Sequence, residues 1–196
     1  MTGIRGFHGF APHVSPLAYV DPSAQLVGHV QVGDDASIWP CSAVRADVHA
    51  IRIGARSNLQ DGALLHVTYE ARCAFGGLAL TIGDNVTIGH GAALYACTVE
   101  DACLIGMGAT ILDGSLVRKH SIVGAGAVVT PGELIGEGEL WLGNPARYIR
   151  MLSDEEIERI YCSARQNVVL GANYRAEQRP PCANIGHEFD RRALRV

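Results

Sequence analysis

The sequence predicts an all-β solenoid, built from three-sided coils of short parallel β-strands and followed by a C-terminal α-helix. Aliphatic residues recur every six positions, and a helix-capping motif precedes an apolar stripe near residue 153. Neither an α-helix nor an alternating strand has a six-residue period, whereas a coil with three flat sides places one aliphatic side chain inside each side. The composition agrees with narrow coils, since aromatic residues make up only 6% and glycine is abundant, with 23 residues.

Residues 1–150 are predicted to form the solenoid, together with a short N-terminal segment that precedes the first repeat. The first run covers Val14 to about His49, where the phase slips by three residues, as a small insertion at one corner would cause. The pattern lapses from Val67 to Ala79, which predicts a loop at 67–79 that projects from the solenoid. Grouping the repeats in threes gives roughly six to seven coils. The repeated positions are Val14, Val20, Leu26, Val32, Ile38 and Val44 in the first run and Ile105, Ile111, Val117, Val123 and Val129 in the last.

Residues 151–177 are predicted to form a helix that packs on the solenoid. Ser153 is followed three residues later by Glu156, which is the pattern of a capping box, and the acidic first turn suits the helix dipole. Residues 178–196 contain Pro180-Pro181 among charged residues and are expected to be extended or disordered. The apolar stripe of the helix is Ile157, Ile160, Tyr161, Ala164 and Val168.

Charge and cysteine usage narrow the classes of partner and site. The net charge of -4 and the pI near 6.0 give no electrostatic reason to expect nucleic acid or an anionic membrane as partner. No apolar stretch approaches the roughly 20 residues that span a bilayer, and no secretory h-region is present, so we expect a cytoplasmic protein. The six Cys residues include no Cys-x-x-Cys pair, which disfavours a zinc ribbon or a dithiol site. Cys97 and Cys103 are expected to be buried, reduced thiols.

The repeat predicts where three candidate metal-binding side chains point. His66 follows the inward Leu65 and Tyr95 follows the inward Leu94, so both should point outward and stack on neighbouring strands. His90 lies on a different flat side, and a neighbouring subunit would have to bring it to the other two. An outward His is also compatible with a solvated or interface residue.

Four strongly polar residues precede His66 on nearby coils. Arg45 and Asp47 lie in one repeat, and Gln60 and Asp61 in another. They are consistent with a salt-bridge network at an interface, in which Arg45 pairs with an Asp. They are equally consistent with a site, because carboxylates and amides orient metal ligands and water.

Over about residues 10–175 the sequence resembles the gamma-class carbonic anhydrases, in particular their short bacterial branch. That family consists of trimeric, left-handed β-helices of hexapeptide repeats, and the resemblance supplies the hand of the coil, since general crossover rules favour the right. The motifs that carry it are Arg45-Ala46-Asp47, Asn58-Leu59-Gln60-Asp61-Gly62, Leu65-His66-Val67-Thr68, Ile88-Gly89-His90-Gly91, Ile105-Gly106-Met107-Gly108 and Gly143-Asn144-Pro145-Ala146.

The resemblance implies a zinc ion at each boundary of a homotrimer, held by three His from two subunits. His66 and His90 match two of these ligands, with His90 contributed across the boundary. The third falls at Tyr95, where relatives usually have His. A neutral phenol is a poor zinc donor, so the site is expected to be empty, to hold metal weakly, or to use a Tyr-tolerant metal such as iron; weakened binding ranks first.

The resemblance also assigns auxiliary roles. Gln60 would orient the hydroxide or substrate, and Arg45 with Asp47 or Asp61 would brace the interface. Val48 stands where some members have a proton-shuttling Glu; His49 or Glu70 is a candidate substitute. A Tyr of the terminal helix is matched by Asn167.

The activity implied is the reversible hydration of carbon dioxide to bicarbonate by a metal-bound hydroxide. Because Tyr95 replaces a ligand His, we expect that activity to be weak or lost. Two alternatives remain. One is a hexapeptide-repeat acyltransferase that uses coenzyme A, which the fold alone does not exclude, and the other is a noncatalytic trimeric scaffold.

Overall fold

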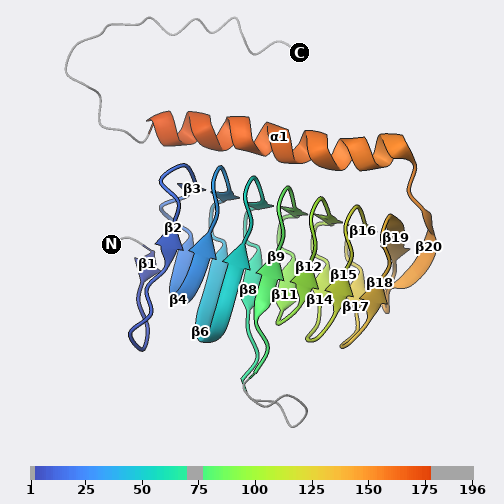
Figure 1. The fold of residues 1–196 in the computed structure, drawn as a ribbon, viewed down its shortest axis with the longest axis horizontal. Coiled ribbons are helices and arrows are strands. Elements are labelled where there is room, and N and C mark those ends of the chain that lie inside the picture. The colour runs from blue at the N-terminus through green and yellow to red at the C-terminus, as the bar shows by residue number, and fades with distance from the viewer. Residues whose placement is uncertain (1–2, 70–76, 178–196) are drawn as a thin grey trace, which may run out of the picture.

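The computed structural model describes residues 3–69 and 77–177, which form a parallel β-solenoid of about 7 turns with one C-terminal helix (Figure 1). The predicted fold class, a left-handed β-helix of hexapeptide repeats with a C-terminal helix, is confirmed. The predicted tail at 178–196 lies outside the described residues.

The solenoid has three flat sides, which we name by an element of each. The helix flat contains β3 (Tyr19–Val20), β5 (Ser37–Ile38), β7 (Asn58–Leu59), β10 (Thr87–Ile88), β13 (Leu104–Ile105), β16 (Ile122–Val123) and β19 (Glu139–Leu142), with β20 (Arg147–Met151) antiparallel to β19. The β8 flat contains β1 (Ile4–Arg5), the first halves of β4 (Gln25–Val32) and β6 (Ala43–Ile53), β8 (Leu64–His66), β11 (Ala93–Tyr95), β14 (Thr110–Ile111) and β17 (Val128–Val129). The β9 flat contains β2 (His13–Val14), the second halves of β4 and β6, β9 (Leu80–Ile82), β12 (Thr98–Val99), β15 (Leu116–Val117) and β18 (Leu134–Ile135).

The repeated aliphatic side chains fill the interior of the coils. From Leu26 onward they are buried, whereas Val14 and Val20 of the first coil are only partly buried. Stacked strands place like residues over one another, as with Ile88, which pairs with Leu59 on one side and Ile105 on the other. This continuous aliphatic column supplies the main hydrophobic contribution to stability.

Glycines that follow the repeat positions permit the coils to stack closely. A Cβ on Gly106 would lie 2.4 Å from the backbone nitrogen of Ala125 in the next coil. The residues with positive φ are not these glycines but lie at the turns of the coils. At one corner they are non-glycine residues, namely Asp35, Arg56, Asn85, Ala102 and His120.

The three-residue slip in the repeat is an insertion within β6. The two steps from Gly28 to Val30 of β4 lie opposite the five steps from Ala46 to Ile51 of β6. The extra residues bulge outward at the corner between the β8 and β9 flats. The described arms of the predicted loop at 67–79 meet in an antiparallel bridge between Thr68 and Leu78, and Figure 1 shows them leaving the solenoid together.

Helix α1 (Asp154–Glu177) lies along the helix flat (Figure 1). The predicted capping box is present: the Glu156 amide donates to Ser153 Oγ at 3.3 Å, and the Ser153 amide donates to a Glu156 carboxylate oxygen at 2.9 Å. Ile160 and Ala164 of the predicted stripe are buried, as is Gly171 one turn beyond the end of that stripe. No helix within residues 3–69 and 77–177 is long and apolar enough to cross a membrane.

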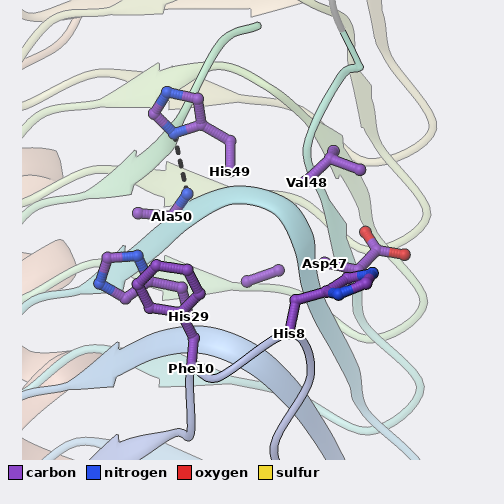
Figure 2. A pocket seen from close by; sticks show the side chains of 8 residues that line it. His8, Phe10, His29, Asp47, Val48, His49 and Ala50 are labelled. Atoms are coloured by element: carbon purple, nitrogen blue, oxygen red, sulfur yellow. Dashed lines mark hydrogen bonds between the residues drawn. The ribbon is translucent and has the colours of Figure 1, made fainter. Parts of the chain in front are cut away.

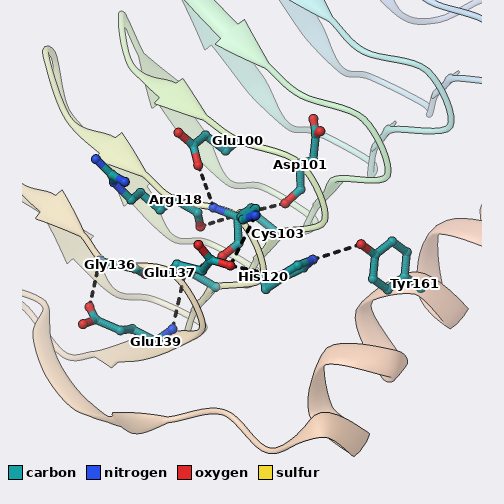
Figure 3. A network of polar contacts seen from close by, with 11 residues as sticks. Glu100, Asp101, Cys103, Arg118, His120, Gly136, Glu137, Glu139 and Tyr161 are labelled. Carbon is teal, nitrogen blue, oxygen red and sulfur yellow. Dashed lines mark hydrogen bonds and ion pairs between the residues drawn. The ribbon is translucent and has the colours of Figure 1, made fainter.

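Polar side chains fasten α1 to the coils. Figure 3 shows Tyr161 reaching His120 at a coil corner, with 3.0 Å between its hydroxyl oxygen and Nε2 of the imidazole. Further along, the Ser163 hydroxyl lies 3.2 Å from that of Thr87. These contacts fix which helix residues face the coils that carry the candidate site.

Candidate functional site

The β8 flat brings His66 and Tyr95 together, as the repeat predicts. The two residues are direct partners in the pairing of β8 with β11, and their ring centroids lie 5.5 Å apart. Arg45 of β6 is the partner of His66 on its other side. One outward column therefore carries Arg45, His66 and Tyr95 in consecutive coils.

His66 is held by its Nδ1 atom. That nitrogen lies 2.9 Å from the backbone carbonyl oxygen of Arg45, which can only accept, so Nδ1 carries the proton. The Nε2 atom is left with a lone pair for a metal or another proton donor. Arg45 forms an ion pair with Asp47, whose other carboxylate oxygen is buried and lies 3.8 Å from His66 Nδ1. The expected pairing of Arg45 with an Asp is thus confirmed within one chain.

His90 lies on the helix flat, beyond the end of β10, and is also held by Nδ1. Its Nδ1 atom lies 3.0 Å from a carboxylate oxygen of Asp61, and both side chains are about half exposed. In the neutral ring, a proton on Nδ1 facing this carboxylate leaves Nε2 of His90 with a lone pair. The Nδ1 atom of His66 is therefore held by a hydrogen bond to a carbonyl oxygen, whereas that of His90 lies within ion-pair distance of a carboxylate.

Gln60 lies beside this second half and is fixed by its amide nitrogen. Nε2 donates to Asn58 Oδ1 at 2.8 Å and to Asn167 Oδ1 of α1 at 2.9 Å. The side-chain carbonyl Oε1 remains as the acceptor of the amide. Helix α1 thus determines how Gln60 is presented.

A cleft that the sequence did not indicate adjoins Gln60 and His90. Its volume is about 550 Å³, and it lies on the helix flat beside Ser163 of α1, with mainly apolar walls. Met107 on its rim is well exposed, at 59%. The walls include Thr87, Leu104, Ile122, Leu140 and Ser163.

One chain therefore carries the predicted site residues as two separate halves. His66 and Tyr95 face outward from the β8 flat, whereas His90, Gln60 and Asp61 belong to the helix flat. Within the described residues of a single chain, no three His, Cys, Asp or Glu side chains are close enough to hold a metal. The two imidazoles are donors that suit a metal, whereas the neutral phenol of Tyr95 is a poor zinc donor.

His49 and its neighbours line a second cavity, shown in Figure 2, of about 290 Å³. His49 Nδ1 accepts a hydrogen bond from the Ala50 amide at 2.8 Å, so its proton resides on Nε2. Figure 2 also shows His8 among the side chains that line this cavity, and His29 stacks on Phe10 with ring centroids 4.7 Å apart. Sequence reasoning missed His8 and His29; the repeat slip opposite His29 was the available signal. Glu70, the other candidate relay, lies outside the described residues.

Two cysteines of the coils, Cys97 and Cys103, serve packing. Cys97 and Cys103 are buried and unbridged, as expected. Burial raises the pKa of each thiol to about 12, which disfavours the reactive thiolate.

Residues 97–131 match the family model described as the hexapeptide repeat of succinyl-transferase. The chain is 47% identical to "Gamma carbonic anhydrase 1, mitochondrial" from Arabidopsis thaliana, an alignment that covers 91% of this chain and 64% of the relative. It is 40% identical to "Protein YrdA" from Escherichia coli, over 84% of this chain and 90% of the relative. It therefore spans slightly less than two thirds of the length of the Arabidopsis protein.

The solved structures include a hexapeptide transferase family protein from Anaplasma phagocytophilum. That protein superposes with a TM-score of 0.81 at 33% identity, and the match covers 87% of this chain and 97% of the other.

Proposed function

Since the chain belongs to the gamma carbonic anhydrase family, we propose that it forms a homotrimer with a metal site at each subunit boundary. The reaction proposed is the reversible hydration of carbon dioxide to bicarbonate. We expect this hydration to be slower than at a site with three His ligands, or absent, because Tyr95 stands in the third ligand position.

The observation that carries the proposal is the separation of the two halves onto different flat sides. In a ring of identical subunits, each boundary joins one surface of a chain to a different surface of its neighbour. The boundary would then combine His66 and Tyr95 of one copy with His90 of the next. The free Nε2 atoms of both imidazoles support this pairing.

A zinc ion held there would act as a Lewis acid that makes water nucleophilic at neutral pH. The chain's own residues would hold the metal ligands in place and orient the water or bicarbonate. The Arg45 carbonyl and the Asp61 carboxylate fix the imidazoles, while Gln60 offers its Oε1 as an acceptor for a water or bicarbonate proton. The phenol oxygen of Tyr95 is a poor metal ligand unless it is deprotonated. We therefore expect weakened metal binding, and so a low metal occupancy of the site, as the first consequence. Iron, which tolerates phenolate, is the alternative metal.

The test compares the unaltered protein with Tyr95→His, using elemental analysis and stopped-flow hydration of carbon dioxide. We expect zinc to rise from substoichiometric to near one per chain, and hydration to rise by at least about tenfold. Tyr148→His is the matched control, because Tyr148 is half exposed in β20, outside the candidate halves. Stoichiometric zinc and high activity in the unaltered protein would contradict the proposal.

Acyl transfer from coenzyme A is the second candidate function. The apolar cleft beside His90 and the similarity to a hexapeptide transferase family protein favour it. Calorimetric titration with acetyl-CoA tests it, and a lack of binding would exclude it. A protein that binds neither metal nor acetyl-CoA, and that gains activity only through Tyr95→His, would be a noncatalytic scaffold.

A further inference from the structure

A column of outward side chains leads from the N-terminal strand to the candidate site. Arg5 of β1 is the register partner of Val27, and Val27 is the partner of Arg45. Arg45 is in turn the partner of His66. Two guanidinium groups therefore share one flat side with His66, on the coils that precede it.

A cavity of about 270 Å³ lies along this column. Its walls contain both arginines, His66 and the amide of Gln25, and its remaining walls are apolar or aliphatic, with Val27 among them. This volume lies just below the range for small-molecule sites, roughly 300 to 1,000 Å³, so it suits a ligand of a few atoms and is too small for a coenzyme.

The cavity has an uncompensated positive charge. Arg45 is paired with Asp47, whereas Arg5 donates from Nη1 to the neutral Oε1 of Gln25 at 2.8 Å. No Asp or Glu is among the described residues that line the cavity. Arg5 is therefore the charge available to an anion that enters.

We propose that this cavity binds a small monoanion with planar, carboxylate-like oxygens, and that Arg5 is its principal charged contact. A guanidinium presents a flat fork of N–H donors that matches two such oxygens. Bicarbonate has this shape, and its identity as the natural ligand rests on the proposed function. Placed beside His66, the subsite would hold the product of hydration, or the substrate of the reverse reaction, next to the metal ligands.

The proposal is tested by direct binding of ¹³C-bicarbonate, followed by NMR line width at constant ionic strength. The full-length protein is used both as purified and after EDTA treatment. We expect saturable binding in both samples and a Kd at least about tenfold higher for Arg5→Gln. Arg52→Gln is the matched control, since Arg52 lies in β6 but faces outward from the β9 flat. Formate competition distinguishes a general carboxylate site, where it displaces bicarbonate, from a site selective for bicarbonate.

Three results would overturn the subsite. Binding that disappears with EDTA and ignores Arg5→Gln would place the anion on the metal instead. Equal binding in Arg5→Gln and Arg52→Gln would indicate a nonspecific ionic effect. A change of oligomeric state in Arg5→Gln alone would mean that a neighbouring chain's carboxylate, not a free anion, occupies the cavity. Each result is independent of hydration, so the failure of this inference is distinguishable from failure of the proposed function.

Discussion

The two candidate imidazoles differ in what holds them. His66 relies on a backbone carbonyl, which no side-chain substitution removes, whereas His90 relies on the carboxylate of Asp61. A carboxylate close to Nδ1 raises the basicity of the ring as a ligand and favours the tautomer with the proton on Nδ1. The His90 half is therefore the one whose orientation a point substitution can test.

We predict that Asp61→Asn weakens metal affinity by about 10- to 100-fold when it is made in the Tyr95→His background. The amide has the shape of the carboxylate but loses its charge, so the imidazole is less strongly polarised. Competition with a chelator measures the affinity. Asp113→Asn is the control, because that side chain lies elsewhere on the solenoid; an equal effect in both variants would refute a specific role for Asp61.

At the scale of elements, the ends of α1 are held by different kinds of contact. Its start is capped by Ser153 and Glu156, and Arg150 of β20 reaches both carboxylate oxygens of Glu156 at 2.7 and 2.8 Å. Its last turns pack Tyr174 against the aromatic rings of Tyr19 and Trp39. The start is thus the end that responds to pH.

The pKa of Glu156 is lowered to about 2, chiefly by the hydrogen bonds from Arg150 and then by that from the Ser153 amide. Because the folded pKa lies below the ordinary value of 4.5, the stabilisation is complete above pH 4.5 and is lost as the pH falls toward 2. We predict that Glu156→Gln is less stable than the unaltered protein at pH 6, and that the gap closes near pH 2. Thermal unfolding across this range measures it; a gap that stays constant would contradict the assignment.

The same elements show what the sequence alone could predict. The slip near His49 located the insertion that the structure places in β6, because a shift in phase is visible in the pattern itself. The contact between Gln60 and Asn167 was beyond reach, since 107 residues separate them and only the placement of α1 joins them. The stacking of His66 on Tyr95 was predictable, because stacked coils align residues by register. The tautomers of both imidazoles depend on partners that no six-residue period specifies.

At the scale of the whole molecule, the solenoid separates its functional residues by direction. Side chains on one flat side cannot turn through the filled core to reach another, so the β8 flat and the helix flat of one chain cannot share a ligand. The separation itself makes assembly a testable requirement. A monomer in solution would leave both halves incomplete.

Mixing two inactive variants tests this requirement directly. In the Tyr95→His background, His66→Ala lacks one half and His90→Ala the other, and each alone should bind no stoichiometric zinc. In trimers refolded from an equal mixture, each boundary receives its His66 half and its His90 half from either variant with equal chance. About a quarter of the boundaries therefore combine an intact His66 with an intact His90. We predict recovery of about a quarter of the zinc and hydration of the parent, measured by elemental analysis and stopped flow. A site within one chain would recover none on mixing, because neither variant contains both imidazoles.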